Sequence, residues 1–418
     1  MNIRLGTQWL YLTIVFFLAL QGCATFNPRP LEDIPFRERA LTKYENNVRV
    51  TAAVPSAEEN KRLFGVDMYK RGVQPVWLEI ENKDEKPIYF LPYGLDPDYF
   101  SPFEAAFVNH FGHSTPLNEK MNRTFFERSE GSYIASGDVR SGFVYTNLDE
   151  GTKGFIVDIV GEDREFRTFT FFINVPGLRA DHQQVDFEAL YSKADMVEYD
   201  EEGLRRALED LPCCTKNKNG TEEGDPLNLV VIGEGEDILH AFIRARWDET
   251  EIIYKKSAWK TALSFLFGGR YRYSPISPLY VYGRRQDVAL QKARGTIHER
   301  NHLRLWLSPM YFDGKPVWVG QISRDIGIRF TSKTIFTHKI DPNVDETRDF
   351  LVEDLWYSQG LLKRTYVKGV GAAPPSEPRG NLTGDPYFSD GLRAVIWISG
   401  KPVGMEEVEF VEWEIPPE

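Results

Sequence analysis

Stretches in which apolar and polar residues alternate dominate the first half of this 418-residue chain. In one such stretch Val76, Leu78 and Ile80 occupy every second position. A period of two residues is that of a β-strand with one buried face. A later run at 168–175 is rich in aromatic and β-branched residues, which favour strands. We therefore expect residues 45–211 to form a mainly-β domain, a sandwich of immunoglobulin-like type.

Two short helices are expected to interrupt these strands. Ser56 and Glu59 have the spacing of a capping box, and Gly65 supplies a stop signal. A second helix is expected to begin at Ser101, which precedes a proline, and to end at Gly112. The sandwich should therefore carry helices between its strands.

The second half of the chain, residues 227–418, mixes helical and strand patterns, which predicts an α+β domain. Asp313 and Gly314 lie between two strand patterns and form a strong hairpin signal. Residues 346–357 have the pattern of a helix. This half is therefore expected to be a second domain with its own core.

Residues 212–226, with the sequence PCCTKNKNGTEEGDP, are rich in turn-forming and charged residues and predict a linker between the two domains. Cys213 and Cys214 are adjacent within it. Consecutive Cα atoms lie about 3.8 Å apart, which is shorter than the usual disulfide range. The sequence leaves open two free thiols, a strained ring between neighbours and a cross-link to another chain.

The N-terminus has the order of a secretory signal peptide, predicted over residues 1–22. Arg4 precedes an apolar run from Trp9 to Leu20, which is too short to span a bilayer comfortably. Gly22 and Cys23 then follow the run closely. A small residue at this place is typical of a cleavage site.

The stretch Leu20-Gln21-Gly22-Cys23 resembles the lipobox of bacterial lipoproteins. The resemblance implies that Cys23 is acylated after cleavage, and that residues 23–44 are a lipidated tether. Two or more acyl chains hold a protein stably on a membrane. Ala24, in place of an aspartate, implies the outer membrane by the same resemblance. The expected location is the bacterial cell envelope, with the membrane as a partner through the N-terminal lipid.

Charge excludes two classes of partner. The chain has 50 basic and 62 acidic residues and a net charge of −12. Nucleic-acid binding needs clustered Lys and Arg, so no nucleic-acid partner is expected. A polybasic mode of membrane binding is disfavoured for the same reason. Attachment to a membrane is therefore expected to come from the lipid.

Candidate catalytic residues occur in the second half. His302 belongs to a strand pattern that places it on one face with Arg304 and Trp306. His338 and Asp341 follow in a later segment. Histidine and aspartate together suit a divalent metal or acid–base chemistry. The structural alternative for Asp341 is a helix N-cap.

Four further charged residues are candidates for ligand binding. Arginines hold phosphate or carboxylate groups. The structural alternative is pairing across a sheet or along a helix. The four residues are Arg304, Arg324, Asp325 and Arg348.

Three ordered motifs carry a family resemblance. They are HLRLW at 302–306, VWVGQISRDIGI at 317–328 and THKIDPNVDETRDFL at 337–351. Together they resemble the LssY-type C-terminal domain, over about residues 226–400. In that family the domain often follows a membrane-embedded phosphatase of the phosphatidic-acid type. The KxxxxxxRP and PSGH elements of that enzyme are missing here, so its chemistry is not carried over.

These observations predict an envelope lipoprotein that acts as a binding or interaction module. Its expected ligand is lipid-phosphate or polysaccharide material of the envelope. The alternative is a periplasmic hydrolase, metal-dependent or not, with a phosphate or ester substrate and His302, His338 and Asp341 at its centre. The sequence does not specify a metal or a cofactor.

Overall fold

The structure is a computed structural model. It describes residues 26–112, 114–149, 151–162, 164–175, 185–187, 189–249, 276–293, 300–329 and 337–416. The chain forms two compact units. Unit 1 comprises Met1–Asp149 and Phe155–Pro176, and unit 2 comprises Glu150–Gly154 and Gly177–Glu418. No helix of the described ranges is long and apolar enough to cross a bilayer.

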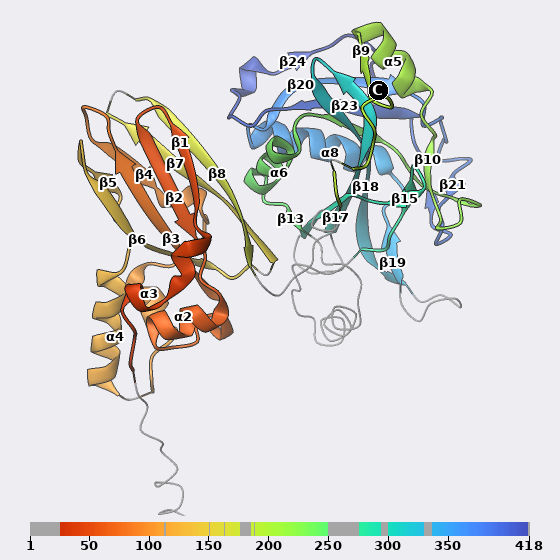
Figure 1. Cartoon of the computed structure of the whole chain (residues 1–418). Coiled ribbons are helices and arrows are strands. Elements are labelled where there is room, and N and C mark those ends of the chain that lie inside the picture. Colours follow the sequence, from red (N-terminus) through yellow and green to blue (C-terminus); the bar gives the residue numbers. More distant parts are fainter. Residues whose placement is uncertain are drawn as a thin grey trace, which may run out of the picture. The chain divides into compact units, whose positions relative to one another are not determined.

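Unit 1 contains two four-stranded antiparallel sheets (Figure 1). The first has the order β1-β2-β3-β6, with β1 (Leu41–Glu45), β2 (Val48–Ala53), β3 (Val73–Asn82) and β6 (Val139–Asn147). The second has the order β5-β4-β7-β8, with β5 (Tyr133–Ile134), β4 (Ile88–Leu91), β7 (Gly151–Gly161) and β8 (Phe166–Val175).

Strand β3 is buried on both sides and so separates two cores. Val76, Leu78 and Ile80 pack with residues of the second sheet, as their alternation predicted. Trp77 points the other way, into a core with Phe64 that also includes side chains of the helices. The mainly-β character of this unit is confirmed, whereas its immunoglobulin-like type stays a prediction.

The helices of unit 1 lie at one end of its sheets (Figure 1) and form the helical layer. They are α2 (Ala57–Phe64), α3 (Pro102–Phe107) and α4 (Thr115–Glu127), and 3-10 turns occur at η1 (Leu31–Asp33), η2 (Pro35–Arg39), η3 (Tyr69–Arg71) and η4 (Pro92–Gly94). The capping box of Ser56 and Glu59 is confirmed, and Gly65 ends α2 with a φ of 67°. Helix α3 has the expected start at Ser101 but ends before Gly112. It stops because the chain turns into α4, where the Asn118 side chain accepts a hydrogen bond from the Phe111 amide.

The predicted tether of residues 23–44 is largely part of the folded unit. Phe26, Ile34 and Phe36 are buried in the core beside the helical layer. Leu41 then begins β1. Apolar side chains spaced through this stretch have a core to fill, so the described part of the stretch packs instead of extending into solvent.

Unit 2 is built on a mixed ten-stranded sheet with the main order β13-β16-β17-β18-β12-β23-β20-β24, to which β19 and β9 add on β18 and β17. Its strands are β9 (Val197–Tyr199), β12 (Leu229–Ile232), β13 (Asp248–Glu249), β16 (Val288–Ala293), β17 (Arg300–Phe312), β18 (Lys315–Arg329), β19 (Thr337–Ile340), β20 (Leu361–Lys368), β23 (Leu392–Ile398) and β24 (Glu409–Phe410). The β17–β18 hairpin is confirmed, because Asp313 and Gly314 have φ values of 52° and 68° at its turn.

Different helices pack on the two faces of this sheet. On one face, α6 (Gly235–Arg244) and α8 (Val344–Tyr357) pack on side chains that include Leu303 and Leu305. We call this the α8 face. On the other, α5 (Glu201–Glu209) packs on a core that includes Trp306. We call this the α5 face.

Two smaller sheets and a 3-10 turn complete unit 2. The first sheet has the order β11-β10-β14-β15, with β10 (Cys214–Lys216), β11 (Glu223–Pro226), β14 (Tyr280–Val281) and β15 (Arg284–Arg285). The second pairs β21 (Arg379–Gly380) with β22 (Pro386–Tyr387), and the turn is η6 (Met405–Glu407). The helix predicted at 346–357 is α8, and the mixture of helices and sheets fits the expected α+β class.

The predicted linker at 212–226 differs from the observed division, which lies near residue 176. Strands β10 and β11 pair within that stretch and belong to unit 2. A hairpin with a polar turn has the same composition as a linker, so composition alone does not separate the two. Helix α5, expected in the first domain, packs in unit 2.

Arg393 of β23 joins several segments of unit 2. It is fully buried, and its guanidinium donates to the backbone carbonyls of five residues. These are Leu208, Leu211, Pro212, Leu227 and Gly369. One side chain thus satisfies carbonyls at the end of α5, just before β10, just before β12 and just after β20.

Candidate functional site

Strand β17 places His302 and Arg304 on the α5 face together with Trp306, as the alternation predicted. His302 lies opposite Ser323 of β18, and Arg304 lies opposite Gln321. Arg304 donates from Nη1 to Gln321 Oε1 over 2.6 Å and from Nη2 to the Ser277 carbonyl over 2.9 Å. Its guanidinium is therefore oriented by neighbouring polar groups.

Asp325 is the acidic centre of this face. Its Oδ2 lies 3.2 Å from His302 Nε2 and 3.5 Å from Arg300 Nε. Burial raises the pKa of Asp325 to about 7, and this effect outweighs the attraction of Arg300 and Arg304. Burial also lowers the pKa of Arg300. A carboxyl group with a pKa near neutrality beside an imidazole is suited to proton transfer.

Asp225 of β11 completes what we call the buried charge cluster: Asp225, Arg300, His302, Arg304 and Asp325. Its Oδ1 accepts a hydrogen bond of 2.9 Å from Asn381, and burial raises its pKa. All five side chains are buried. The cluster thus brings two guanidiniums, two carboxyl groups and one imidazole together in the interior.

Arg324 belongs to the opposite, α8 face, although it is adjacent to Asp325. It donates to Asn301 over 3.0 Å and to Glu346 of α8 over 2.9 Å. Its guanidinium lies 5.2 Å from the centre of the Phe350 ring. Successive residues of a strand point to opposite faces, so Arg324 and Asp325 act in different environments.

Arg348 of α8 is held in an ion network. Two of its nitrogens bind the two carboxylate oxygens of Asp390 over 2.9 and 3.0 Å, and Nε binds Asp349 over 2.9 Å. Asp345 also lies within 3.3 Å. These carboxylates raise the pKa of Arg348, and the side chain is 1% exposed. Arg348 therefore fastens α8 to the segment before β23.

Asp341 also lies near the start of α8. Its Oδ1 accepts a hydrogen bond from the Asn343 amide over 3.0 Å. The N-cap of α8 is Asn343, whose side chain accepts from the Glu346 amide. The predicted cap is thus displaced by two residues, because the Pro342 segment turns before the helix begins.

The register does not bring His302 and His338 together. His302 pairs with Ser323, whereas the backbone of His338 pairs with Ile328; the side chain of His338 lies outside the described part. Five positions along β18 correspond to roughly 15 Å at about 3.3 Å per residue. The predicted centre of His302, His338 and Asp341 is therefore not assembled as one site. His302 has Asp325 as its acidic neighbour instead.

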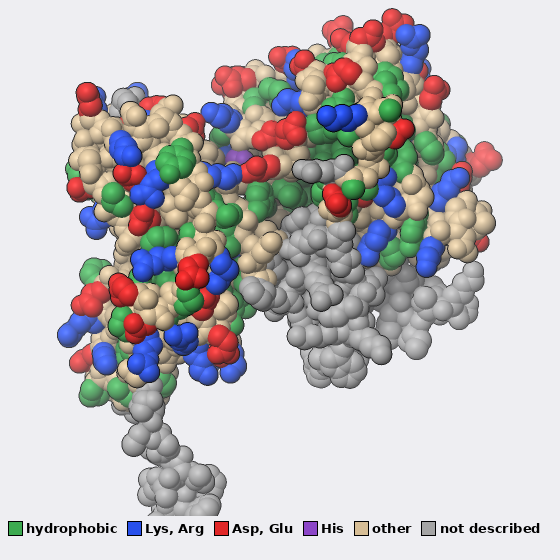
Figure 2. All heavy atoms as spheres, viewed as in Figure 1, with side chains coloured by type: hydrophobic (Ala, Val, Ile, Leu, Met, Phe, Trp, Pro, Cys, Tyr) green, Lys and Arg blue, Asp and Glu red, His purple; other side chains and the backbone are tan. Residues whose placement is uncertain are grey.

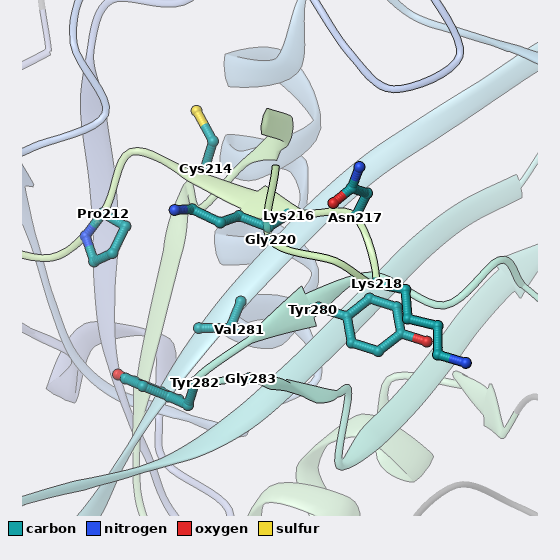
Figure 3. A pocket seen from close by; sticks show the side chains of 10 residues that line it. All are labelled: Pro212, Cys214, Lys216, Asn217, Lys218, Gly220, Tyr280, Val281, Tyr282 and Gly283. Carbon is teal, nitrogen blue, oxygen red and sulfur yellow. The ribbon is translucent and has the colours of Figure 1, made fainter. Parts of the chain in front are cut away.

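A cavity of about 120 Å³ lies beside the small sheet of unit 2. Figure 3 shows its lining side chains, which come from two segments, 212–220 and 280–283. Tyr280 and Tyr282 bring aromatic rings to its mostly apolar lining. The ammonium groups of Lys216 and Lys218 extend in different directions (Figure 3). Lys216 lies opposite Tyr280 in the strand pairing. We call this the tyrosine–lysine pocket.

One of the two adjacent cysteines, Cys214, belongs to the lining of this pocket. Cys213 and Cys214 are joined in a disulfide, which is one of the alternatives left open by the sequence. Glu223 Oε2 lies 3.7 Å from Cys213 Sγ, so the three residues place possible metal-ligand atoms within 4.8 Å of one another. A bonded sulfur is not a thiolate, so the oxidised pair does not offer thiolate ligands to a metal.

Sequence reasoning missed Arg300 and Asp225. Arg300 continues the same alternation as His302 and Arg304, so a longer pattern includes it. Asp225 reaches the cluster from a strand far away in sequence, and nothing local indicates that approach. The tyrosines of the pocket were missed for the same reason.

One comparison with known protein families matches the part of the chain that contains these sites. The family model described as LssY C-terminus matches residues 205–392. The match begins within α5 and ends at the first residue of β23, so it contains the buried charge cluster and the tyrosine–lysine pocket. Unit 2 therefore carries an LssY-type C-terminal domain, as its motifs indicated. No curated protein matches the chain.

Proposed function

We propose that this protein is a lipid-anchored binding protein of the bacterial cell envelope, attached at Cys23 to the outer membrane. Its ligand in this proposal is an envelope polysaccharide with carboxylate or phosphate groups. The supporting observation is the tyrosine–lysine pocket in unit 2, which combines two aromatic rings with two cationic side chains. Pockets of mainly apolar lining with a few polar groups are typical binding sites.

The chemistry of the pocket suits one acidic saccharide unit. Tyrosine rings offer flat apolar faces and a polar hydroxyl, which match the two sides of a sugar ring. Lysine is a compact cation that binds phosphate or carboxylate as a point charge. A cavity of about 120 Å³ is far too small for a complete phospholipid. Polysaccharide is therefore preferred over lipid-phosphate as the ligand.

Calorimetric titration of the mature protein with acidic and neutral oligosaccharides tests the ligand. Replacing both Lys216 and Lys218 by Gln should weaken binding of the acidic oligosaccharide by about tenfold or more, because a hydrogen bond to a charged group is lost. The matched control is Lys193→Gln, an exposed lysine of unit 2 outside the pocket. Equal affinity of the double variant and the control would contradict the proposal.

Metabolic labelling with a fatty-acid analogue tests the anchor. The wild-type chain should incorporate the label, and Cys23→Ser should not, because the thiol is the acceptor. Labelling of both to the same extent would rule out Cys23 as the attachment site.

A hydrolase is the second candidate, and it now rests on the His302–Asp325 pair. The supporting observation is the 3.2 Å contact together with the pKa of about 7 for Asp325. Release of phosphate or of a carboxylic acid from envelope-derived esters is the measurement. Turnover by the wild type that His302→Ala abolishes, in a variant that still binds saccharide, would favour this candidate.

A further inference from the structure

The first described residues are fixed to the helical layer of unit 1. Phe26 is 5% exposed and packs in the core that includes Met121 and Phe125 of α4. Lys120 Nζ lies 5.7 Å from the centre of the Phe26 ring and 3.5 Å from the Phe26 carbonyl. The chain therefore enters the folded unit at α4.

The distance from this entry point to the proposed lipid is short. Phe26 follows Cys23 by three positions in the sequence. Three residues span at most about 11 Å when fully extended. An acyl group on Cys23 thus keeps the helical layer close to the surface of the bilayer.

The same layer carries an exposed group of phenylalanines on α3 and α4, which we call the aromatic patch: Phe103, Phe107 and Phe126. Their side chains are 54%, 71% and 57% exposed. Phe103 and Phe126 stack with ring centres 5.6 Å apart, and Phe107 follows Phe103 by one helical turn. Figure 2 shows hydrophobic side chains at the lower left edge of the helical layer, next to charged ones.

These rings are not needed by the core. Ala105, Ala106 and Phe125 fill the core side of the same helices. Exposed residues around the patch include acids and bases, such as Glu104, Glu119 and Arg123, so charge does not identify an occupant. Exposed aromatic side chains on helices suit the headgroup boundary of a membrane, where amphipathic helices bury an apolar face.

We infer that the aromatic patch inserts into the same bilayer leaflet that holds the acyl chains on Cys23. The inference rests on the proposed lipid anchoring. Acyl chains alone anchor a protein but leave its orientation free, because the chain bonds of the tether rotate. A second contact, from rings on two packed helices, fixes the orientation of unit 1 at the membrane.

Fluorescence quenching by brominated lipids tests this contact. The full acylated protein is reconstituted in vesicles of phosphatidylethanolamine and phosphatidylglycerol, with and without bromine on the acyl chains. Phe107→Trp should add fluorescence that the brominated vesicles quench. Tyr44→Trp is the matched control, because Tyr44 is also 71% exposed but lies on β1. Its added fluorescence should be retained.

Co-sedimentation with the vesicles separates the two proposals. If the acylated protein does not co-sediment, the lipid anchor and the membrane contact both fail. If it co-sediments but the two tryptophans are quenched equally, or neither is, the anchor stands and the contact is overturned. Hydrogen exchange on the unsubstituted protein gives an independent measurement: α3 amides should gain protection on vesicles, and unchanged exchange would also overturn the contact.

Discussion

The interiors of the two units differ in the charge that they bury. Unit 1, counted with all of its strand β7, buries two side chains of Asp, Glu, Lys or Arg among the described residues, Lys153 and Arg167. Arg167 pairs with Asp84 over 2.8 Å. Unit 2 buries many more, among them the buried charge cluster, Arg348 and Arg393. Buried charge costs solvation free energy and is tolerated where partners compensate for it. Unit 1 is thus held mainly by apolar packing, whereas unit 2 also depends on the pairing of specific groups.

Removing one partner of a buried ion network should lower the free energy of unfolding more than any other substitution proposed here. Arg348→Ala leaves Asp345, Asp349 and Asp390 without their common cation, and should lower the free energy of unfolding of unit 2 by about 3–5 kcal/mol. The control in unit 1 is Arg49→Ala, because Arg49 pairs with Glu79 and Glu81 but is partly exposed. Its loss should cost about 1 kcal/mol or less.

Hydrogen exchange followed by mass spectrometry measures this difference for each unit separately. Faster exchange of α8 and β23 in Arg348→Ala, with unit 1 unchanged, is the expected pattern. Equal costs for the two substitutions would show that the units do not differ in their dependence on ion pairs.

The pH dependence of stability should also distinguish the units. The pKa of Asp325 is raised from 3.8 to about 7 in the folded chain, so between these values the folded state holds a proton that the unfolded state has released. The contribution of this group to stability is therefore present below pH 3.8 and is lost as the pH rises towards 7. Asp325→Asn should remove this part of the slope, which is at most about 1.4 kcal/mol per pH unit.

Denaturant unfolding of wild type and Asp325→Asn between pH 4 and 7, in steps of about one unit, provides the measurement. A matched acid in unit 1 is Glu81, whose pKa is lowered chiefly by its hydrogen bond to Arg49. Glu81→Gln should leave the falling slope of the wild type in place. An unchanged slope in Asp325→Asn would mean that the carboxyl is ionised throughout this range.

Substitutions of helix N-caps should lower the free energy of unfolding least, and by similar amounts in both units. Asn343→Ala removes the side chain that accepts from Glu346, and Ser56→Ala removes the acceptor for Glu59. Each should cost about 1 kcal/mol. Asp341→Asn should cost less, since it keeps an oxygen that can accept from Asn343. Thermal unfolding ranks the three variants, and a larger loss for Asp341→Asn would restore this residue as the principal cap.

The sequence predicted local structure well where a short pattern of residues determines it. Alternation placed His302 and Arg304 on one face of β17, and Asp313 with Gly314 marked the hairpin. Arg324 and Asp325 were grouped because they are neighbours, although the same alternation along β18 places them on opposite faces. Long-range pairing was not predicted, so Asp225 was missed.

The domain boundary was missed for a related reason. A polar, turn-rich stretch occurs both in linkers and in hairpins, and residues 212–226 contain the β10–β11 hairpin. The actual division lies at Pro176 and Gly177, where the aromatic run of β8 stops. The pairing of β10 with β14 helps to decide between the two interpretations, and β14 is distant in sequence.

Arg393 shows that the part of a chain recognised by similarity need not be the part that folds. The family match ends at residue 392, one position before this arginine. A chain shortened to that end would lose most of β23, and the carbonyls of Leu208, Leu227 and Gly369 would lose the donor that they share. The smallest version of unit 2 that can be produced by itself should therefore extend through β23 to the η6 and β24 segments.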